Sequence, residues 1–162
     1  AEFTEAIGAL YGMAFTIKMT RKFAGTQDYS VGKLEARWPG FEGKCPAAVN
    51  KDEWTWELLI RTPEFVRETD LKQARATLKK RGKDGGTERV ELLRLDEGLC
   101  VQALHTGPYE EEERTFQAML EYAAGKGYQA GGAHGEIYLS DPRRVEPRKL
   151  KTILRVPLRA TA

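Results

Sequence analysis

The stretch 134–144, with the sequence HGEIYLSDPRR, carries one glutamate among aliphatic and aromatic residues in a pattern typical of a short strand. Side chains alternate between the two faces of a strand, so Glu136 and Tyr138 are expected on one surface and Ile137 and Leu139 on the other. If that surface lines a cleft, an acid beside a phenol forms a site. On the local pattern alone, the commoner arrangement is a glutamate that faces solvent from a half-exposed sheet. The rest of the chain must decide between the two.

Aromatic residues elsewhere in the chain could wall such a cleft. Burial among rings penalises the charged form of a carboxylate, so the acid would be poised to accept a proton or to face a cationic or electron-poor ligand. Rings also offer a flat ligand a large apolar area. For Phe15 and Trp56, ordinary core packing is the stronger alternative. The candidates for the wall are Tyr11, Phe15, Trp38, Trp54, Trp56, Tyr109 and Tyr138.

The two histidines have different prospects. His134 lies two residues before Glu136 and shares its face by alternation, so it is added to the candidates for ligand contact. His105 ends a predicted strand before a Gly-Pro turn and is expected to be structural.

Composition limits the class of protein. The chain has 162 residues, 41% of them hydrophobic, which is enough for one compact domain with a core. Its 26 Lys and Arg against 24 Asp and Glu give a net charge of +2, so charge provides no case for a nucleic-acid partner. No apolar run approaches the roughly 20 residues of a membrane span and no signal pattern is present, so a cytoplasmic protein is expected. Cys45 and Cys100 lack zinc-site spacing and are expected to be free thiols, and no metal site is expected.

The first half of the chain predicts one helix and two strands. Apolar residues recur at helical spacing over 4–21, and the expected apolar face is formed by Ile7, Leu10, Tyr11, Ala14 and Phe15. Strands are predicted over 28–38 and 54–60, separated by a loop rich in Pro and Gly.

The second half repeats this order. A strand is predicted over 98–106, a helix over 110–125, then the Glu136 strand, and a final strand over 152–156 that Pro157 closes. The four acids at 110–113 complement the positive end of the helix dipole and are interpreted as a solvated helix start, not a metal site. Between the halves, 69–82 predicts a polar helix, whose basic cluster at 79–81 is expected to be ordinary surface. Because the second copy has a leading strand and the first does not, a strand upstream of Ala1 is hypothesised to be missing.

Six groups of residues together resemble the GyrI-like family and extend over nearly the whole chain. They are 6–12 (AIGALYG), 54–56 (WTW) with 60–65 (IRTPEF), 97–102 (EGLCVQ), 105–109 (HTGPY), 136–144 (EIYLSDPRR) and 149–155 (KLKTILR). More narrowly, the sequence is similar to the stand-alone bacterial branch of that family. Some members of this branch hydrolyse cyclopropane-bearing, DNA-alkylating natural products of the yatakemycin and duocarmycin type.

The resemblance implies an α+β fold of duplicated strand-helix-strand-strand modules, with an antiparallel sheet and a ligand cleft between the halves. The expected organisation is one GyrI-like domain over 1–162, with modules at 1–66 and 90–162 and a connector at 67–89. The acid at Glu136 would be the central carboxylate of the cleft. The sequence departs from the family's pattern in three places: the leading strand is absent, the loop 126–133 is short, and Gly135 stands where a larger side chain, often histidine, is expected.

For the resembled hydrolases, the chemistry is addition of water to a strained, conjugated cyclopropane. Glu136 would be the general base, and Tyr138 or Tyr109 would steady the developing oxyanion. This predicts a detoxifying hydrolase. The competing prediction is a non-catalytic binder or sensor of amphipathic aromatic or cationic drugs, and a third is a protein-interaction module that uses the acids at 110–113. The sequence shows no phosphate loop, nucleophile elbow, HExxH or paired-carboxylate motif, so no cofactor is expected, and no protein partner is indicated.

Overall fold

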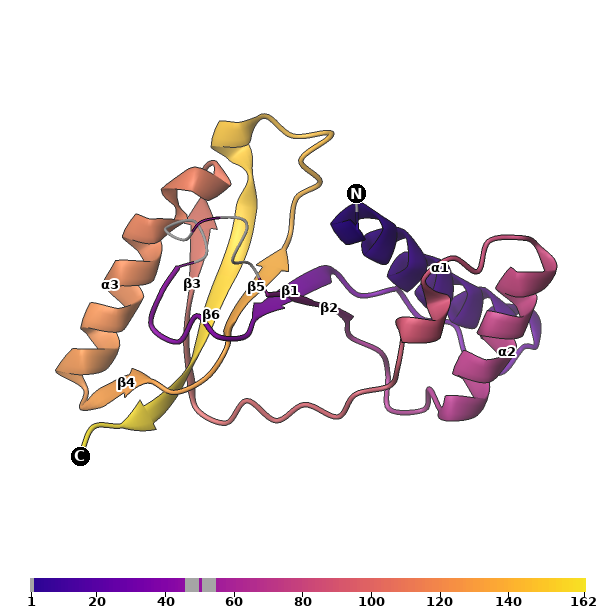
Figure 1. Cartoon of the computed structure of the whole chain (residues 1–162), viewed down its shortest axis with the longest axis horizontal. Helices are drawn as coiled ribbons and strands as arrows, with labels where there is room; N and C mark the ends of the chain where they lie inside the picture. Colours follow the sequence, from indigo (N-terminus) through magenta and orange to yellow (C-terminus); the bar gives the residue numbers. More distant parts are fainter. Residues whose placement is uncertain (1, 46–49, 51–54) are drawn as a thin grey trace. The chain divides into compact units, whose positions relative to one another are not determined.

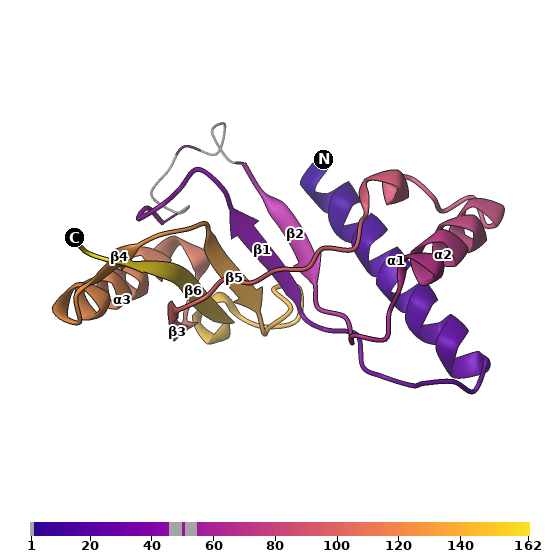
Figure 2. The same ribbon diagram turned by 90° about the horizontal axis from the view of Figure 1, so that it is seen from below.

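The structure is a computed structural model that describes residues 2–45, 50 and 55–162. It is an α+β fold in which six strands form an antiparallel sheet of order β2-β1-β5-β6-β3, with β4 paired to β6, and this confirms the predicted fold class. The main elements, shown in Figures 1 and 2, are α1 (Glu2–Phe23), β1 (Leu34–Trp38), β2 (Glu57–Ile60), α2 (Glu68–Lys80), β3 (Cys100–Thr106), α3 (Glu112–Gly125), β4 (Tyr128–Ala130), β5 (His134–Tyr138) and β6 (Lys151–Ala160). Three short 3-10 helices, η3 (Thr87–Arg89), η4 (Tyr109–Glu111) and η5 (Pro147–Lys149), complete the described elements.

The chain divides into two compact units, one formed by Ala1–Lys33 and Leu58–Leu95 and the other by Leu34–Glu57 and Asp96–Ala162. The three helices predicted at 4–21, 69–82 and 110–125 are confirmed as α1, α2 and α3. The division into modules at 1–66 and 90–162 with a connector at 67–89 stays a prediction, as does the cleft that the resemblance implies.

In the first unit, α1 and α2 pack side by side (Figure 1). The buried residues of α1 are Ala9, Met13, Ala14 and Ile17. Of these, Met13 and Ile17 pack in one cluster with Leu71, Ala74 and Leu78 of α2. Of the predicted apolar face, Ala14 is buried and Ile7, Leu10 and Tyr11 are half-buried, whereas the prediction is wrong for Phe15, which is 50% exposed. The apolar residues of α1 lie on nearly all sides of the helix, so their periodicity could not distinguish the face that α2 covers.

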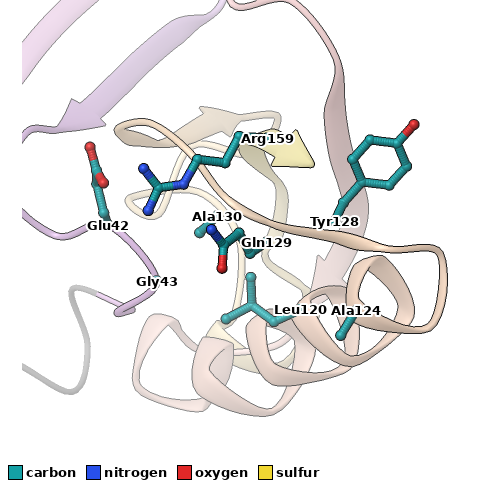
Figure 3. Close-up of a pocket in the computed structure, with 8 residues that line it drawn as sticks. All are labelled: Glu42, Gly43, Leu120, Ala124, Tyr128, Gln129, Ala130 and Arg159. Atoms are coloured by element: carbon teal, nitrogen blue, oxygen red, sulfur yellow. The ribbon is translucent and has the colours of Figure 1, made fainter. Parts of the chain in front are cut away.

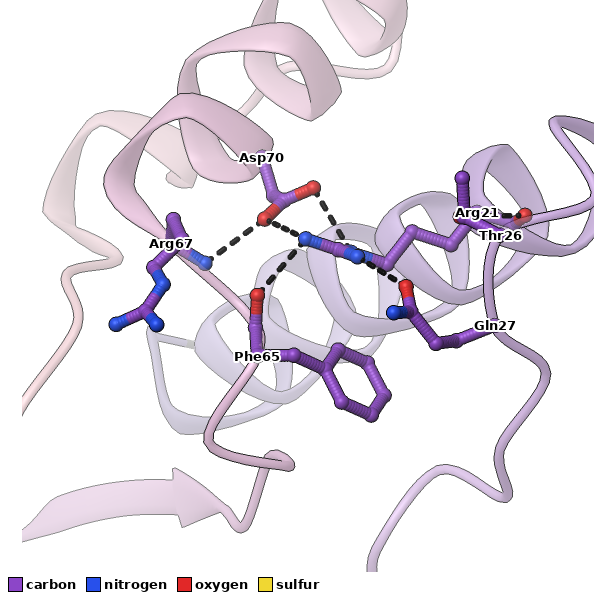
Figure 4. A network of polar contacts seen from close by, with 6 residues as sticks. All are labelled: Arg21, Thr26, Gln27, Phe65, Arg67 and Asp70. Carbon is purple, nitrogen blue, oxygen red and sulfur yellow. Dashed lines mark hydrogen bonds and ion pairs between the residues drawn. The ribbon is translucent and has the colours of Figure 1, made fainter.

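A polar network fixes the start of α2 (Figure 4). The Arg21 guanidinium of α1 donates to both oxygens of Asp70, at 3.0 and 2.7 Å, and to the backbone carbonyl of Phe65 at 2.8 Å. Asp70 also accepts the backbone N–H of Arg67, the residue that caps the helix, at 2.8 Å. A carboxylate in the first helical turn complements the helix dipole, so one side chain joins the two helices and caps one of them.

In the second unit, α3 covers one face of the sheet (Figure 1). Phe116 and Met119 of α3 pack on Leu154 and Val156 of β6, together with Cys45. The register pairs Glu136 of β5 with Leu154 on one side and with Ala36 of β1 on the other. Residues opposite one another in a ladder point to the same face, so Glu136 faces α3.

Two predicted strands are shorter than expected. Of 28–38, only Leu34–Trp38 is a strand, because Tyr29 packs edge-on against Phe65 of the first unit with ring centroids 5.6 Å apart. Gly32 lies so close to the backbone of Arg61 that a Cβ atom would stand 2.9 Å from its carbonyl oxygen. Of 54–60, the strand is Glu57–Ile60, and Trp54 lies outside the described residues.

The prediction that Pro157 closes the last strand is wrong, since β6 continues to Ala160. The Pro157 carbonyl accepts the N–H of Gly131, so the missing N–H of Pro157 points to that same side of β6. Along this side, β6 pairs with β5 as far as Arg155 and with β4 from Leu158 onward. Pro157 therefore falls between two partners, where a strand tolerates proline. The strand β4, within the predicted loop 126–133, was not foreseen.

Candidate active site

Glu136 is 4% exposed and accepts two hydrogen bonds from its own strand. The Tyr138 hydroxyl donates to Oε2 at 2.6 Å, and Nε2 of His134 lies 3.1 Å from Oε1. The three side chains alternate with Gly135 and Ile137, so β5 places all of them on the face that α3 covers. The alternative in which Glu136 faces solvent is wrong for this structure.

A second carboxyl group meets Glu136 from α3. Glu112 is 2% exposed, in contrast to Glu110 and Glu111, which are exposed. The interpretation of 110–113 as a solvated helix start is therefore wrong for Glu112. Glu112 precedes the buried Phe116 by four residues and so lies on the same face of the helix. This spacing is the sequence signal that could have found it.

The two carboxyl groups cannot both carry a full charge at low cost. Burial, and next the negative charge of Glu136, raises the pKa of Glu112 from its ordinary value of 4.5 to about 9. The proximity of the two side chains thus favours a proton on Glu112. At neutral pH Glu112 is thus a carboxylic acid beside Glu136, an arrangement that can donate one proton and accept another.

Two tyrosines border this pair. The rings of Tyr109, in η4, and Tyr138 meet edge to face with centroids 6.0 Å apart. Burial, followed by the charge of Glu136, raises the pKa of Tyr138 well above 10, and burial with the charges of Glu112 and Glu136 raises that of Tyr109. Both phenols therefore remain hydrogen-bond donors at neutral pH.

Tyr138 is expected to be the last tyrosine of the folded protein to ionise as the pH rises, because its pKa is raised well above 10. Tyr138→Phe should therefore remove the final step of the titration. The measurement is an alkaline titration of absorbance at 295 nm, in which the variant is subtracted from the original protein. A difference spectrum that already develops near pH 10 would contradict the placement of Tyr138 against Glu136. Since the raised pKa binds the proton more tightly in the folded state, stability is expected to fall as the pH rises above 10.

The other predicted residues are distributed over both units. Trp38 is buried on β1 in register with His134, and Trp56 is half-buried. Tyr11 and Phe15 belong to the first unit, where their rings stack with centroids 6.0 Å apart. The roles of all four in ligand binding stay predictions. His105 is buried, with Nδ1 2.8 Å from the Thr115 hydroxyl and Nε2 3.2 Å from the Pro108 carbonyl, as expected of a structural histidine.

A surface pocket of about 390 Å³ lies elsewhere in the second unit (Figure 3). None of the residues around Glu136 lines it. The Leu120 side chain is directed toward Gln129, and the Tyr128 ring points away (Figure 3). The lining residues are Glu42, Gly43, Leu120, Ala124, Tyr128, Gln129, Ala130 and Arg159. Because it lacks the paired carboxyl groups, we base the candidate site on Glu136 and Glu112.

The described part of the chain contains no group of three or more His, Cys, Asp or Glu side chains arranged to hold a metal ion. None of its helices combines the length and the apolar character that a membrane crossing requires.

The chain is similar to a known protein family and to several solved structures. Residues 54–159 match the model of the GyrI-like small molecule binding domain. Three solved structures from Listeria innocua are similar over most of their length. A hydrolase is 38% identical with a TM-score of 0.86 over 97% of this chain and 80% of that one. An uncharacterized conserved protein is 38% identical with a TM-score of 0.88, over 98% of this chain and 81% of that one. A further hydrolase structure is 37% identical with a TM-score of 0.84, over 97% of this chain and 79% of that one.

No curated protein matches the chain. The family model covers more than half of the sequence, and the solved structures share both its fold and more than a third of its residues. The chain therefore belongs to the GyrI-like small-molecule-binding family.

Proposed function

We propose that this protein is a hydrolase that adds water to the cyclopropane ring of electrophilic, DNA-alkylating aromatic compounds and so detoxifies them. The observation that carries the proposal is the buried pair of carboxyl groups, Glu136 and Glu112, with a tyrosine hydroxyl 2.6 Å from one of them. Two of the similar solved structures are hydrolases, which supports the class of reaction.

The pair divides the chemistry between an acid and a base. Ionised Glu136 removes a proton from water as its oxygen attacks the ring CH₂ carbon. The ring C–C bond breaks, and its electron pair moves through the conjugated system to the substrate's carbonyl oxygen. Protonated Glu112 donates its proton to that oxygen, and a phenol forms. General acid and base catalysis of this kind typically contributes ~10² to 10⁴ in rate each.

The proximity of the two carboxyl groups closes the cycle. After the reaction Glu136 holds the proton taken from water and Glu112 is ionised. Transfer of that proton from Glu136 to Glu112 restores the starting state without help from solvent. Substrate and water together equal the ring-opened product, so no further reactant is needed.

Tyr109 and Tyr138 complete the proposed site. Both remain protonated at neutral pH because their pKa values are raised. A phenol donor can stabilise charge that develops on the substrate oxygen, and the edge-to-face ring pair offers an apolar wall to a flat ligand. The proposed ligand contacts of Tyr11, Phe15, Trp38, Trp54, Trp56 and His134 follow from the sequence.

The second candidate is a non-catalytic binder of amphipathic aromatic or cationic drugs. It is favoured by the same buried acid, since a carboxylate beside aromatic side chains also complements a cation. The interaction module that would use 110–113 has less support, because Glu112 is buried.

One experiment separates hydrolase from binder. A duocarmycin-type compound with an intact cyclopropane is incubated with the protein, and the products are followed by mass spectrometry. A hydrolase is expected to return the ring-opened alcohol, heavier by one water, with many turnovers per protein molecule and faster than in buffer alone. Recovery of the intact compound from a stoichiometric complex would instead establish the binder.

A further inference from the structure

His134 is a buried titratable side chain to which the proposed reaction gives no step. It is 1% exposed, and its ring packs edge-on against Phe116 of α3 with centroids 5.0 Å apart. Trp38 of β1 is its neighbour in register. The imidazole thus lies among rings on the covered face of the sheet, beside Glu136. The role of His134 in ligand contact stays a prediction.

The two ring nitrogens of His134 have different surroundings. Nε2 lies 3.1 Å from Oε1 of Glu136, whereas Nδ1 is buried with no hydrogen-bond partner among the described residues. A carboxylate oxygen only accepts, so Nε2 must carry a proton to make this hydrogen bond. A second proton on Nδ1 would be a buried donor without an acceptor, which is costly. The neutral tautomer protonated on Nε2 satisfies both conditions.

The hydrogen bond from His134 complements the one from Tyr138. Each oxygen of Glu136 receives one donor, Oε1 from His134 and Oε2 from Tyr138. Two donors from the same strand hold the plane of the carboxylate, and the Phe116 ring holds the plane of the imidazole. The charged and titratable groups that face this arrangement are Glu136 and Tyr138 of β5, Glu112 of α3 and Tyr109 of η4.

We infer that His134 is a positioning residue: a neutral imidazole that donates from Nε2 to Glu136 and fixes the orientation of that carboxylate. The inference rests on the proposed function where it concerns rate. Its structural part, the tautomer and the hydrogen bond, does not depend on any reaction.

Two variants test the effect on rate. Glutamine extends an N–H donor about as far as Nε2 of histidine, while leucine fills a similar volume without a donor. His134→Gln is expected to keep kcat for ring opening within about 3-fold. His134→Leu is expected to lower kcat by ~10- to 100-fold with KM changed by less than about 3-fold. Equal activity of the leucine variant, or equal losses in both variants, would overturn the inference.

A nuclear magnetic resonance measurement tests the inference without any substrate. The protein is labelled with ¹⁵N-histidine, and the signals of His134 are identified by their loss in His134→Gln. At pH 7.5, Nε2 is expected to show the protonated pattern and Nδ1 the unprotonated one, and Glu136→Leu should abolish this preference. A proton on Nδ1, or a pattern that Glu136→Leu leaves unchanged, would overturn the inference. If no form of the protein opens the ring, the proposed function fails while this test still decides the role of His134.

Discussion

Glu136→Gln is expected to lower kcat for ring opening by about 10² to 10⁴-fold, with the Kd of the intact compound changed by less than about 3-fold. Glutamine keeps the shape of the side chain and can still accept from Tyr138, but it cannot take a proton from water. The measurement is turnover by mass spectrometry, together with the Kd from quenching of tryptophan fluorescence under conditions where the ring stays closed.

The matched control is Glu121→Gln, which removes the same charge at an exposed position of α3. It is expected to behave like the original protein. If Glu136→Gln weakens binding as much as it lowers turnover, Glu136 serves as a charge complement and the base is another group. Full turnover in Glu136→Gln would remove Glu136 from the reaction altogether.

Glu112→Gln is expected to lower kcat by about 10²-fold and yet to stabilise the protein. The pKa of Glu112 is raised from 4.5 to about 9, so the folded state binds its proton more tightly than the unfolded state does. The stability that this carboxyl contributes is fully present below pH 4.5 and is lost as the pH rises toward 9. At pH 7 the loss is on the order of 3 kcal/mol, and an amide at this position avoids it.

Urea unfolding from pH 4 to pH 9 measures this effect. The free energies of unfolding of the variant and the original protein should agree near pH 4, where both side chains are neutral, and should diverge as the pH rises. Glu121→Gln should show no such divergence. A constant difference at all pH values would mean that Glu112 is not held protonated, and the division of roles between acid and base would then be wrong.

The sequence predicted the helices and the face that Glu136 shares with Tyr138, because both depend on periods that are local. It failed where tertiary contacts decide. The start of the strand predicted at 28–38 is drawn into the first unit by the contact of Tyr29 with Phe65. Pro157 lies within β6, because the strand changes partner at that residue.

The candidate site shows the same division. The alternation of β5 was enough to find Glu136, Tyr138 and His134, but not to show which of them the helix covers. Glu112 was missed because an acid in a first helical turn has an ordinary explanation in the dipole of the helix. Only its spacing from Phe116, four residues on, indicates that it faces the core, and only the structure shows what lies opposite.

Strand β6 pairs with β3 along one edge and with both β5 and β4 along the other, although it comes last of the four in the sequence. While a chain is being synthesised, β3, β4 and β5 therefore emerge before the strand that aligns them. Until β6 is available, their backbone donors and acceptors lack these partners, and edges of this kind readily join those of other chains. The period before Lys151–Ala160 has been made is therefore the one in which these strand edges are most open to pairing with other chains.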